Sequence, residues 1–412
     1  MQPTNKRLVT EASVVGHVGA EVTTPGTPTA AALSATFGRN LTGVQAPIDW
    51  GKVWKPKRNG AKSTVAIVGD SIAQLYDAST YADSWAGKLT ASLQAKYGDG
   101  GSGWIGVANS AKYANSGAGY GNNLMFPVVA SAGWGFTSAL TGPGLVGALS
   151  TVVGDVLTFK NVRGTSANIW AIRNTTNGDI EYRVNGGTYT TASTTGAAGI
   201  IKIPFTLPAG SHTVEVRVKV ANTNGVAIFG LSAENATGVV VNNFSLQSKT
   251  SSAYVATGTY GFAPDWNGGV LYPSDLLIYT LGVNDSFGAA GAATTEDGYI
   301  DNIETLVNAV QNTGGSLGAT DLCFFIPAIG SWQSTGPKYY KMMLRLAAYA
   351  ISKGAAFIDF NAIQRNSRAY GLAVGYYGSG NATPGVAGTD NVHPSDAGMT
   401  QLFEAIDPLV AG

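Results

Sequence analysis

The segment from Val65 to Ser71 is the sequence feature that most constrains the fold. Its apolar, β-branched residues up to Val68 are typical of a parallel strand that is buried on both faces. Gly69, Asp70 and Ser71 follow directly, so polar side chains come where the strand ends. In a parallel sheet that end is the carboxyl edge, where α/β proteins place their functional groups. Ser71 is therefore predicted at that edge.

Alternating strand and helix patterns predict the rest of this sheet. A helix is expected at 83–97, because Trp85, Leu89 and Leu93 recur at i, i+4 spacing and glycines follow from Gly98. Further strands are expected at 276–281, 321–326 and 355–360, and further helices at 296–312, 337–353 and 396–407. This alternation predicts a three-layer α/β/α domain with a mostly parallel sheet. Asn284 follows one of these strands and should lie at the same edge as Ser71.

Residues 113–251 have a different sequence pattern, in which short runs of alternating apolar and polar residues are separated by turn residues. Period-2 runs lie at 156–159, 180–184, 200–203, 212–218 and 239–241. They predict an antiparallel β-sandwich inserted into the α/β domain. The run from Leu207 to Val214 resembles strand entries of jelly-roll carbohydrate-binding modules. We therefore expect an arm at 1–50, a discontinuous α/β domain at 51–112 and 252–412, and a carbohydrate-binding-like sandwich at 113–251.

Composition limits the classes of partner. Charged residues make up only 12% of the chain, and 25 Lys and Arg balance 25 Asp and Glu. No basic field would attract nucleic acid, and no cationic amphipathic helix would attract a membrane. A neutral substrate such as a glycan or a simple ester fits this balance better than a polyanion. Nothing in the sequence indicates an oligomer. The single cysteine, Cys323, is expected in a buried strand as an inert thiol.

The residues that could perform chemistry are few. A serine hydroxyl is a weak nucleophile until a base removes its proton, and the chain has only three histidines. His17 lies in the arm and His212 in a predicted sandwich strand, where it should be a packed or solvated residue. His393 is therefore the expected base for Ser71. Asp390, three residues before it, would accept a hydrogen bond from the imidazole and fix its tautomer.

Three short motifs, in their order along the chain, resemble those of the SGNH (GDSL-type) hydrolase family. The resemblance rests on Gly69-Asp70-Ser71, on Gly282-Val283-Asn284-Asp285 and on Asp390-Asn391-Val392-His393-Pro394, and covers roughly 65–112 and 252–412. It implies a flavodoxin-like α/β/α fold and a serine esterase with Ser71 as nucleophile, His393 as base and Asp390 as orienting carboxylate. The oxyanion donors would be the Ser71 N–H and the Asn284 amide. The long gap between Ser71 and Asn284 departs from the simplest family pattern.

A glycine N–H is the third oxyanion donor in this family, and the sequence leaves its position open. We favour Gly261, with Gly258 second, because a module inserted before this block occurs in SGNH peptidoglycan acetylesterases. Gly119 is the alternative before the sandwich. Asp70 and Asp285 are expected to be structural residues that accept backbone hydrogen bonds.

Other motifs carry less weight. Gly101–Gly106 fits a dinucleotide fingerprint and Gly314–Gly318 a nucleophile elbow, but each follows a helix rather than a strand, so both are expected to be loops. No metal-binding pattern appears, so neither a metal nor a cofactor is predicted. Five aromatic residues could stack on sugar rings: Trp104, Trp266, Trp332, Tyr376 and Tyr377. For each of them alone, packing in the core or in a loop is the simpler interpretation.

The resemblance and composition together favour an esterase that removes O-acetyl groups from a cell-surface or cell-wall polysaccharide. The alternatives are a lipase or general esterase, and a catalytically inert glycan-binding receptor-recognition protein. The low charge and the 55 glycines suggest an extracellular or virion-borne protein. Neither an apolar stretch long enough to span a membrane nor a signal peptide is visible. The arm resembles leader segments of phage tail proteins, which makes a phage tail component one expectation and a flexible linker the other.

Overall fold

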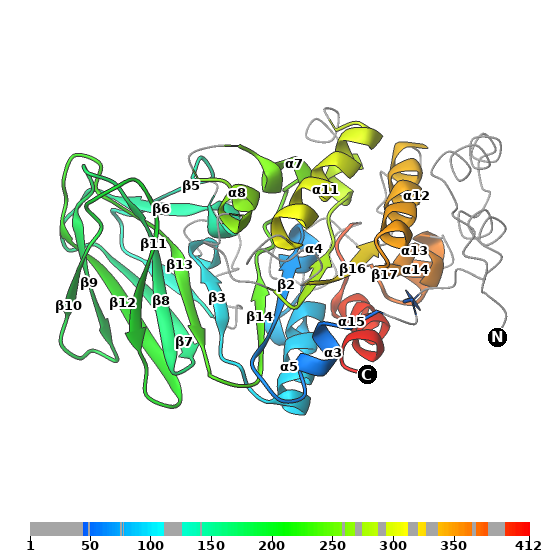
Figure 1. Ribbon diagram of the computed structural model, residues 1–412, viewed down its shortest axis with the longest axis horizontal. Coiled ribbons are helices and arrows are strands. Elements are labelled where there is room, and N and C mark those ends of the chain that lie inside the picture. Colours follow the sequence, from blue (N-terminus) through cyan, green and yellow to red (C-terminus); the bar gives the residue numbers. More distant parts are fainter. Residues whose placement is uncertain are drawn as a thin grey trace.

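A six-stranded sheet forms the centre of the α/β part of the molecule (Figure 1). The computed structural model describes residues 44–47, 50–74, 76, 78–110, 126–140, 142–257, 260–267, 274–286, 294–311, 320–326, 337–364, 368–377 and 392–412. The strand order is β1 (Val44–Gln45), β17 (Ala356–Asp359), β16 (Asp321–Ile326), β15 (Leu276–Tyr279), β2 (Ser63–Val68) and β14 (Val239–Asn243). All of these pairs are parallel except the edge pair β1–β17. The parallel sheet predicted from the sequence is confirmed.

Helices cover both faces of this sheet (Figure 1). The side chains of Val65 and Ile67 pack with α5 (Trp85–Tyr97) and α15 (Asp396–Val410) on one face. Those of Ala66 and Val68 pack with α11 (Glu296–Gln311) and α12 (Pro337–Ser352) on the other. Every residue of β2 is buried, which explains the uninterrupted apolar run from Val65 to Val68. The shorter helices are α3 (Trp54–Lys57), α4 (Ser71–Gln74), α7 (Ser251–Val255), α8 (Phe262–Asn267), α9 (Val283–Ser286), α13 (Phe360–Ile363) and α14 (Arg368–Ala373). The 3₁₀ turns are η1 (Tyr81–Asp83), η2 (Val107–Asn109) and η3 (Pro143–Leu145).

The inserted part is an antiparallel sandwich beside the α/β part (Figure 1). One sheet has the order β10 (Thr190–Ser193), β9 (Asp179–Val184), β12 (Ser211–Val220), β7 (Val156–Arg163) and β4 (Val128–Ala130). The other has the order β11 (Gly199–Thr206), β8 (Ser166–Arg173), β13 (Val226–Glu234), β6 (Gly147–Ser150) and β5 (Gly135–Thr137). Inward residues of β12 such as Val214, Val216 and Val218 are fully buried, which is the alternation that predicted the sandwich.

Two predicted boundaries of the sandwich are wrong. The strand at 239–241 belongs to β14, which pairs in parallel with β2 in the α/β sheet. Its three valines are all buried, as expected for a strand that is covered on both faces. Conversely, β3 (Gly103–Gly106) lies before residue 113 but pairs with β13. This strand occupies part of the glycine-rich segment that was expected to be a loop.

The sandwich and the α/β domain share one hydrophobic core. Trp104 of β3 lies edge-on to Trp170 of β8, with ring centroids 5.7 Å apart, and 5.7 Å from Phe244, which follows β14. The same buried cluster continues to Ala66 and Val68 of β2. The two parts are therefore packed against each other as one body. No helix among the described residues is both long and apolar enough to cross a bilayer.

Candidate active site

Ser71 opens the short helix α4 directly after β2. The turn requires Gly69, because a Cβ there would lie 2.0 Å from the Thr280 Oγ1 atom and 2.6 Å from the Ala73 Cβ atom. The Tyr254 hydroxyl donates a hydrogen bond of 2.7 Å to the Gly69 carbonyl and fixes the turn from the neighbouring layer. First-turn N–H groups of a helix have no intrahelical acceptor, so the Ser71 N–H can donate to an anionic oxygen.

The Ser71 hydroxyl is in hydrogen-bond contact with an imidazole. Its Oγ atom lies 2.7 Å from His393 Nε2. Ser71 is buried and His393 is half-buried. The ring of Tyr76 packs on the imidazole, with ring centroids 4.0 Å apart and an angle of 31° between the planes. This is the nucleophile–base geometry that the sequence predicted for the two residues.

Contacts on its C-terminal side hold His393 in this position. Pro394 forms an antiparallel bridge with Tyr377, and the Ser395 N–H donates to the Tyr376 carbonyl at 2.7 Å. Ser395 is the N-cap of α15, since its hydroxyl accepts a hydrogen bond from Gly398 N. The start of α15 and the 376–377 segment therefore fix the loop that carries the imidazole.

The predicted orienting carboxylate, Asp390, lies outside the described residues. Another aspartate, Asp396, lies three residues after His393, but its carboxylate is engaged elsewhere. It accepts hydrogen bonds from Ser79 N at 2.8 Å and from Ser79 Oγ at 2.6 Å. Asp396 thus connects α15 to the segment before η1.

Asn284 lies in α9, shortly after the end of β15. One hydrogen of its side-chain amide is already used in a hydrogen bond. Its Nδ2 atom donates to the Lys249 carbonyl at 3.0 Å, so one of the two amide hydrogens remains for another acceptor. Asp285 anchors the same turn, because its buried carboxylate accepts from Ser251 N and from Ser251 Oγ. Burial raises the pKa of Asp285 to about 6. Its predicted structural role is confirmed.

The glycine donor is not assigned by these contacts. Gly261 is buried immediately before α8, and a Cβ on it would lie 2.6 Å from the Ala256 carbonyl oxygen. That close approach explains why a glycine stands there. Gly258 and Gly119, the two alternatives, lie outside the described residues.

Asp70 is a fully buried carboxylate beside the nucleophile. One of its oxygens accepts a hydrogen bond of 3.1 Å from Ile72 N, as expected for a structural role. The other oxygen is buried and has no hydrogen-bond partner. Loss of hydration on burial raises the pKa of Asp70 to about 7, and the hydrogen bond from Ile72 opposes this rise.

The remaining candidates are structural where they are described. His212 is held in the sandwich by Pro208 O and Asn185 Nδ2, each 2.9 Å from a ring nitrogen. Cys323 is buried in β16, and burial raises the pKa of its thiol to about 12, which makes it unreactive. Trp104, Tyr376 and Tyr377 are buried, so packing is the correct interpretation for these aromatics. Trp332 and the side chain of Trp266 lie outside the described residues.

Sequence reasoning missed two features around His393. These are the ring of Tyr76 and the Ser79–Asp396 link. Tyr76 lies five residues after Ser71 and Asp396 three residues after His393, and neither spacing forms a motif. Only the fold brings them to the same place.

Known proteins resemble this chain in sequence profile and in fold. The sequence profile described as GDSL-like Lipase/Acylhydrolase matches residues 211–406, a segment that contains Asn284 and His393 but not Ser71. No curated protein sequence matches significantly. The solved structure of a peptidoglycan O-acetylesterase is similar at a TM-score of 0.60 and 16% identity, covering 88% of this chain and 95% of that one.

Two further solved structures are similar over smaller parts or with poorer superposition. A family two carbohydrate esterase from Clostridium thermocellum has 12% identity and a TM-score of 0.27, covering 69% of this chain and 97% of that one. A carbohydrate acetylesterase from Sinorhizobium meliloti has 19% identity and a TM-score of 0.29, covering 42% of this chain and 78% of that one. The chain carries a hydrolase domain of the GDSL (SGNH) lipase/acylhydrolase family, and the protein is a carboxylic ester hydrolase.

Proposed function

We propose that this protein is a serine O-acetylesterase that removes acetyl groups from a cell-surface or cell-wall polysaccharide. The observation that carries the proposal is the 2.7 Å contact between Ser71 Oγ and His393 Nε2. A hydroxyl in that position can pass its proton to the imidazole as it attacks a carbonyl carbon. The contact lies at the carboxyl end of β2, where ligands of open α/β sheets bind.

In the first half of the reaction, Ser71 Oγ attacks the acetyl carbonyl and His393 Nε2 takes the hydroxyl proton. We assign to Asp390 the role of accepting a hydrogen bond from the other ring nitrogen, which would stabilise the imidazolium. The carbonyl oxygen becomes an anion, to which the Ser71 N–H, the second amide hydrogen of Asn284 and the Gly261 N–H donate. Collapse of this intermediate breaks the ester bond. The departing sugar oxygen takes the proton from His393, and the acetyl group stays on Ser71.

In the second half, a water molecule attacks the acetyl-Ser71 carbonyl while His393 Nε2 takes a proton from it. The same donors bind the second oxyanion. Breakdown of the intermediate returns the proton to Ser71 Oγ and releases acetic acid, which loses its remaining proton to solvent as acetate. Ser71 and His393 are then in their starting states.

Charge and architecture support a glycan substrate. Balanced charges favour a neutral polymer over a polyanion. The sandwich packs on the α/β domain through a common core, so a surface of the sandwich can hold a polymer at a fixed position relative to Ser71. A solved protein named as a peptidoglycan O-acetylesterase shares the fold over 88% of this chain, which supports the same combination of parts.

The test measures acetate released from O-acetylated polysaccharides, together with hydrolysis of long-chain acyl esters. The proposal predicts acetate release that Ser71→Ala abolishes, and little turnover of decanoyl esters. Efficient cleavage of long-chain esters without acetate release from any polysaccharide would make the protein a lipase or general esterase. Retention of the polysaccharide with no turnover would make it an inert glycan-binding protein.

We further propose that the protein works outside the cell or as part of a virion, such as a phage tail. The support is its low charge and its glycine-rich β-structure. Mass spectrometry of purified particles and of the culture medium tests this location. Detection only in the cell interior would contradict it.

A further inference from the structure

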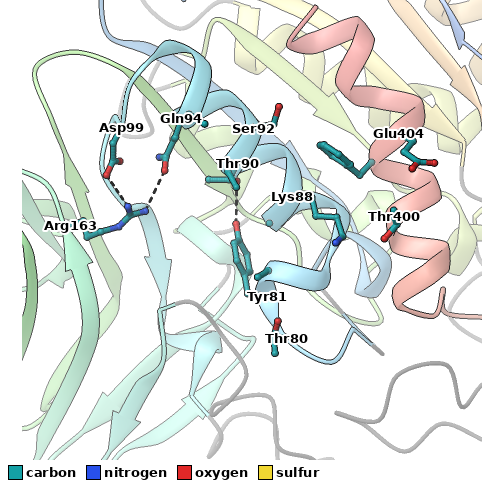
Figure 2. A pocket seen from close by; sticks show the side chains of 15 residues that line it. Thr80, Tyr81, Lys88, Thr90, Ser92, Gln94, Asp99, Arg163, Thr400 and Glu404 are labelled. Carbon is teal, nitrogen blue, oxygen red and sulfur yellow. Dashed lines mark hydrogen bonds and ion pairs between the residues drawn. The ribbon is translucent and has the colours of Figure 1, made fainter.

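A groove runs along the outer side of α5, away from the sheet. Figure 2 shows it between α15 on one side and Arg163, the last residue of β7, on the other. Its volume is about 860 Å³, within the range of ligand sites in proteins. The polar side chains along it include Lys88, Gln94, Asp99, Arg163, Thr400 and Glu404.

One end of the groove adjoins the segments that carry the candidate active site. Thr80 lines this end and directly follows Ser79, whose backbone and hydroxyl bind the Asp396 carboxylate. Tyr76, four residues before Thr80, packs on the His393 ring. Thr400 lines the groove one helical turn after Asp396. The groove therefore begins beside the elements that position the imidazole.

The other end of the groove adjoins the sandwich. Arg163 Nη1 lies 2.8 Å from Asp99 Oδ2, and Arg163 Nη2 donates to Gln94 Oε1 at 3.3 Å (Figure 2). These contacts join β7 to the end of α5. Helix α5 has 13 residues and spans about 20 Å, long enough for several sugar rings in a row.

The chemistry of the lining fits a neutral polymer. Two cationic residues, Lys88 and Arg163, are matched by two anionic ones, Asp99 and Glu404, so the groove has no net charge to select an ion. Sugar hydroxyls can accept hydrogen bonds from guanidinium and amide N–H groups, and they can donate hydrogen bonds to carboxylate and amide oxygens. Phe403 adds an apolar ring against which the C–H face of a sugar can pack.

The floor of the groove is made of small residues. Ala91 and Ala95 are exposed on α5, and Gly87 comes one turn earlier. A Cβ on Gly87 would lie 1.9 Å from the Tyr81 carbonyl oxygen, so η1 packs directly on the helix there. An extended chain can lie close to this helix because no long side chain stands in its centre.

We propose that this groove is a secondary binding site for the polysaccharide chain, which runs from the candidate active site along α5 to Arg163. The proposal rests on the proposed function and adds where the unreacting part of the polymer binds. Interactions with a remote part of the substrate should improve turnover of a polymer and leave a small ester unaffected.

The test blocks the groove with Ala91→Trp and, as an independent second variant, Ala95→Trp. Both positions are exposed, so the folded structure should tolerate them, and melting curves check this. The matched control is Asn308→Trp, on an exposed position of α11 on the opposite face of the sheet. Acetate release is measured on acetylated xylan and acetylated glucomannan, beside hydrolysis of p-nitrophenyl acetate.

We expect kcat/KM for the polymers to fall about tenfold or more in both groove variants, mainly because KM rises. Hydrolysis of p-nitrophenyl acetate should be unchanged, and the control variant should behave like the wild type. Unchanged polymer turnover in the groove variants overturns the groove proposal and leaves the proposed function intact. Equal losses on the polymer and on the small ester also overturn it, because they indicate a structural effect. Failure of the wild type on these two polymers and on the O-acetylated cell-wall polysaccharides of the first test refutes the proposed function itself, and the secondary site with it.

Discussion

Ser71 Oγ and His393 Nε2 lie 2.7 Å apart although 322 positions separate the two residues in the chain. One is fixed by the end of β2 and the other by the start of α15, two elements of the same α/β domain. The sandwich between them in sequence is packed beside the domain and leaves this contact intact. The contact joins a nucleophile to a base, which is the central requirement of serine ester hydrolysis.

Replacing the base should remove activity as completely as replacing the nucleophile. We expect His393→Ala to lower kcat by about 10³-fold or more, since Ser71 would lose its proton acceptor. The double variant with Ser71→Ala should be no slower than either single variant, because the two residues act as a unit. Steady-state kinetics with p-nitrophenyl acetate measure this. The matched control is His212→Asn, a buried histidine of the sandwich that should keep full activity. Additive losses would argue against a joint role.

The two aspartates that flank His393 should behave differently. Asp390→Asn is expected to reduce kcat by as much as about 10⁴-fold with little change in KM, because the imidazole would lose its orienting carboxylate. Asp396→Asn should reduce kcat far less, since Asp396 binds Ser79. The two variants are compared in the same ester assay, with melting curves as the check on folding. A larger loss in kcat for Asp396→Asn would reverse the assignment.

Asn284 should act on the transition state. We predict that Asn284→Ala lowers kcat by about 10²-fold and leaves KM nearly constant, as expected for the loss of one oxyanion donor. Asn302→Ala is the control, because Asn302 also donates an amide hydrogen bond, 2.9 Å long, to Ser251 Oγ. It should lose a structural contact without losing turnover. Equal kinetic effects in the two variants would place Asn284 among the structural residues.

Asp70 should make stability depend on pH. Its folded-state pKa of about 7 lies above the ordinary value of 3.8, so between these values the folded protein retains a proton that the unfolded chain releases. Asp70 therefore lowers the free energy of unfolding as the pH rises from about 4 to 7, by an amount on the order of 4 kcal/mol. Asp70→Asn cannot ionise and should gain stability relative to wild type over that interval.

Urea denaturation of wild type and Asp70→Asn at pH 5 and pH 8 tests this prediction. The difference in unfolding free energy should favour the variant more strongly at pH 8. Asp285, whose pKa is raised to about 6, also lowers the unfolding free energy as the pH rises, and it does so in both proteins. Its charge adds to the rise in the pKa of Asp70, so this interaction is part of the difference that the comparison measures. A difference that does not change with pH would show that Asp70 is ionised throughout.

The main elements of the α/β domain could be predicted because each has a strong local signal. The run before Gly69 is buried along its whole length in β2, and the expected helix at 83–97 is α5, with Ser84 as its N-cap. The pairing of Ser71 with His393 followed from the small number of histidines. These predictions needed only local sequence and the rule that parallel strands share a carboxyl edge.

The domain boundaries could not be predicted, because they depend on which strand pairs with which. The valines of β14 suit a sandwich strand as well as a parallel one, and only pairing with β2 decides. Trp104 could have stacked on a sugar, but β3 pairs with β13 and buries it between the two parts of the molecule. Long-range packing also determines the positions of Tyr76 and Asp396, which no sequence spacing indicated.

The most direct test of the account is hydrolysis of p-nitrophenyl esters from acetyl to decanoyl by the wild type and by Ser71→Ala. We predict acetyl turnover in the wild type that declines with chain length and is absent in the variant, with both proteins unfolding at the same temperature. Acetyl turnover that persists undiminished in Ser71→Ala would contradict the central claim that Ser71, activated by His393, is the nucleophile.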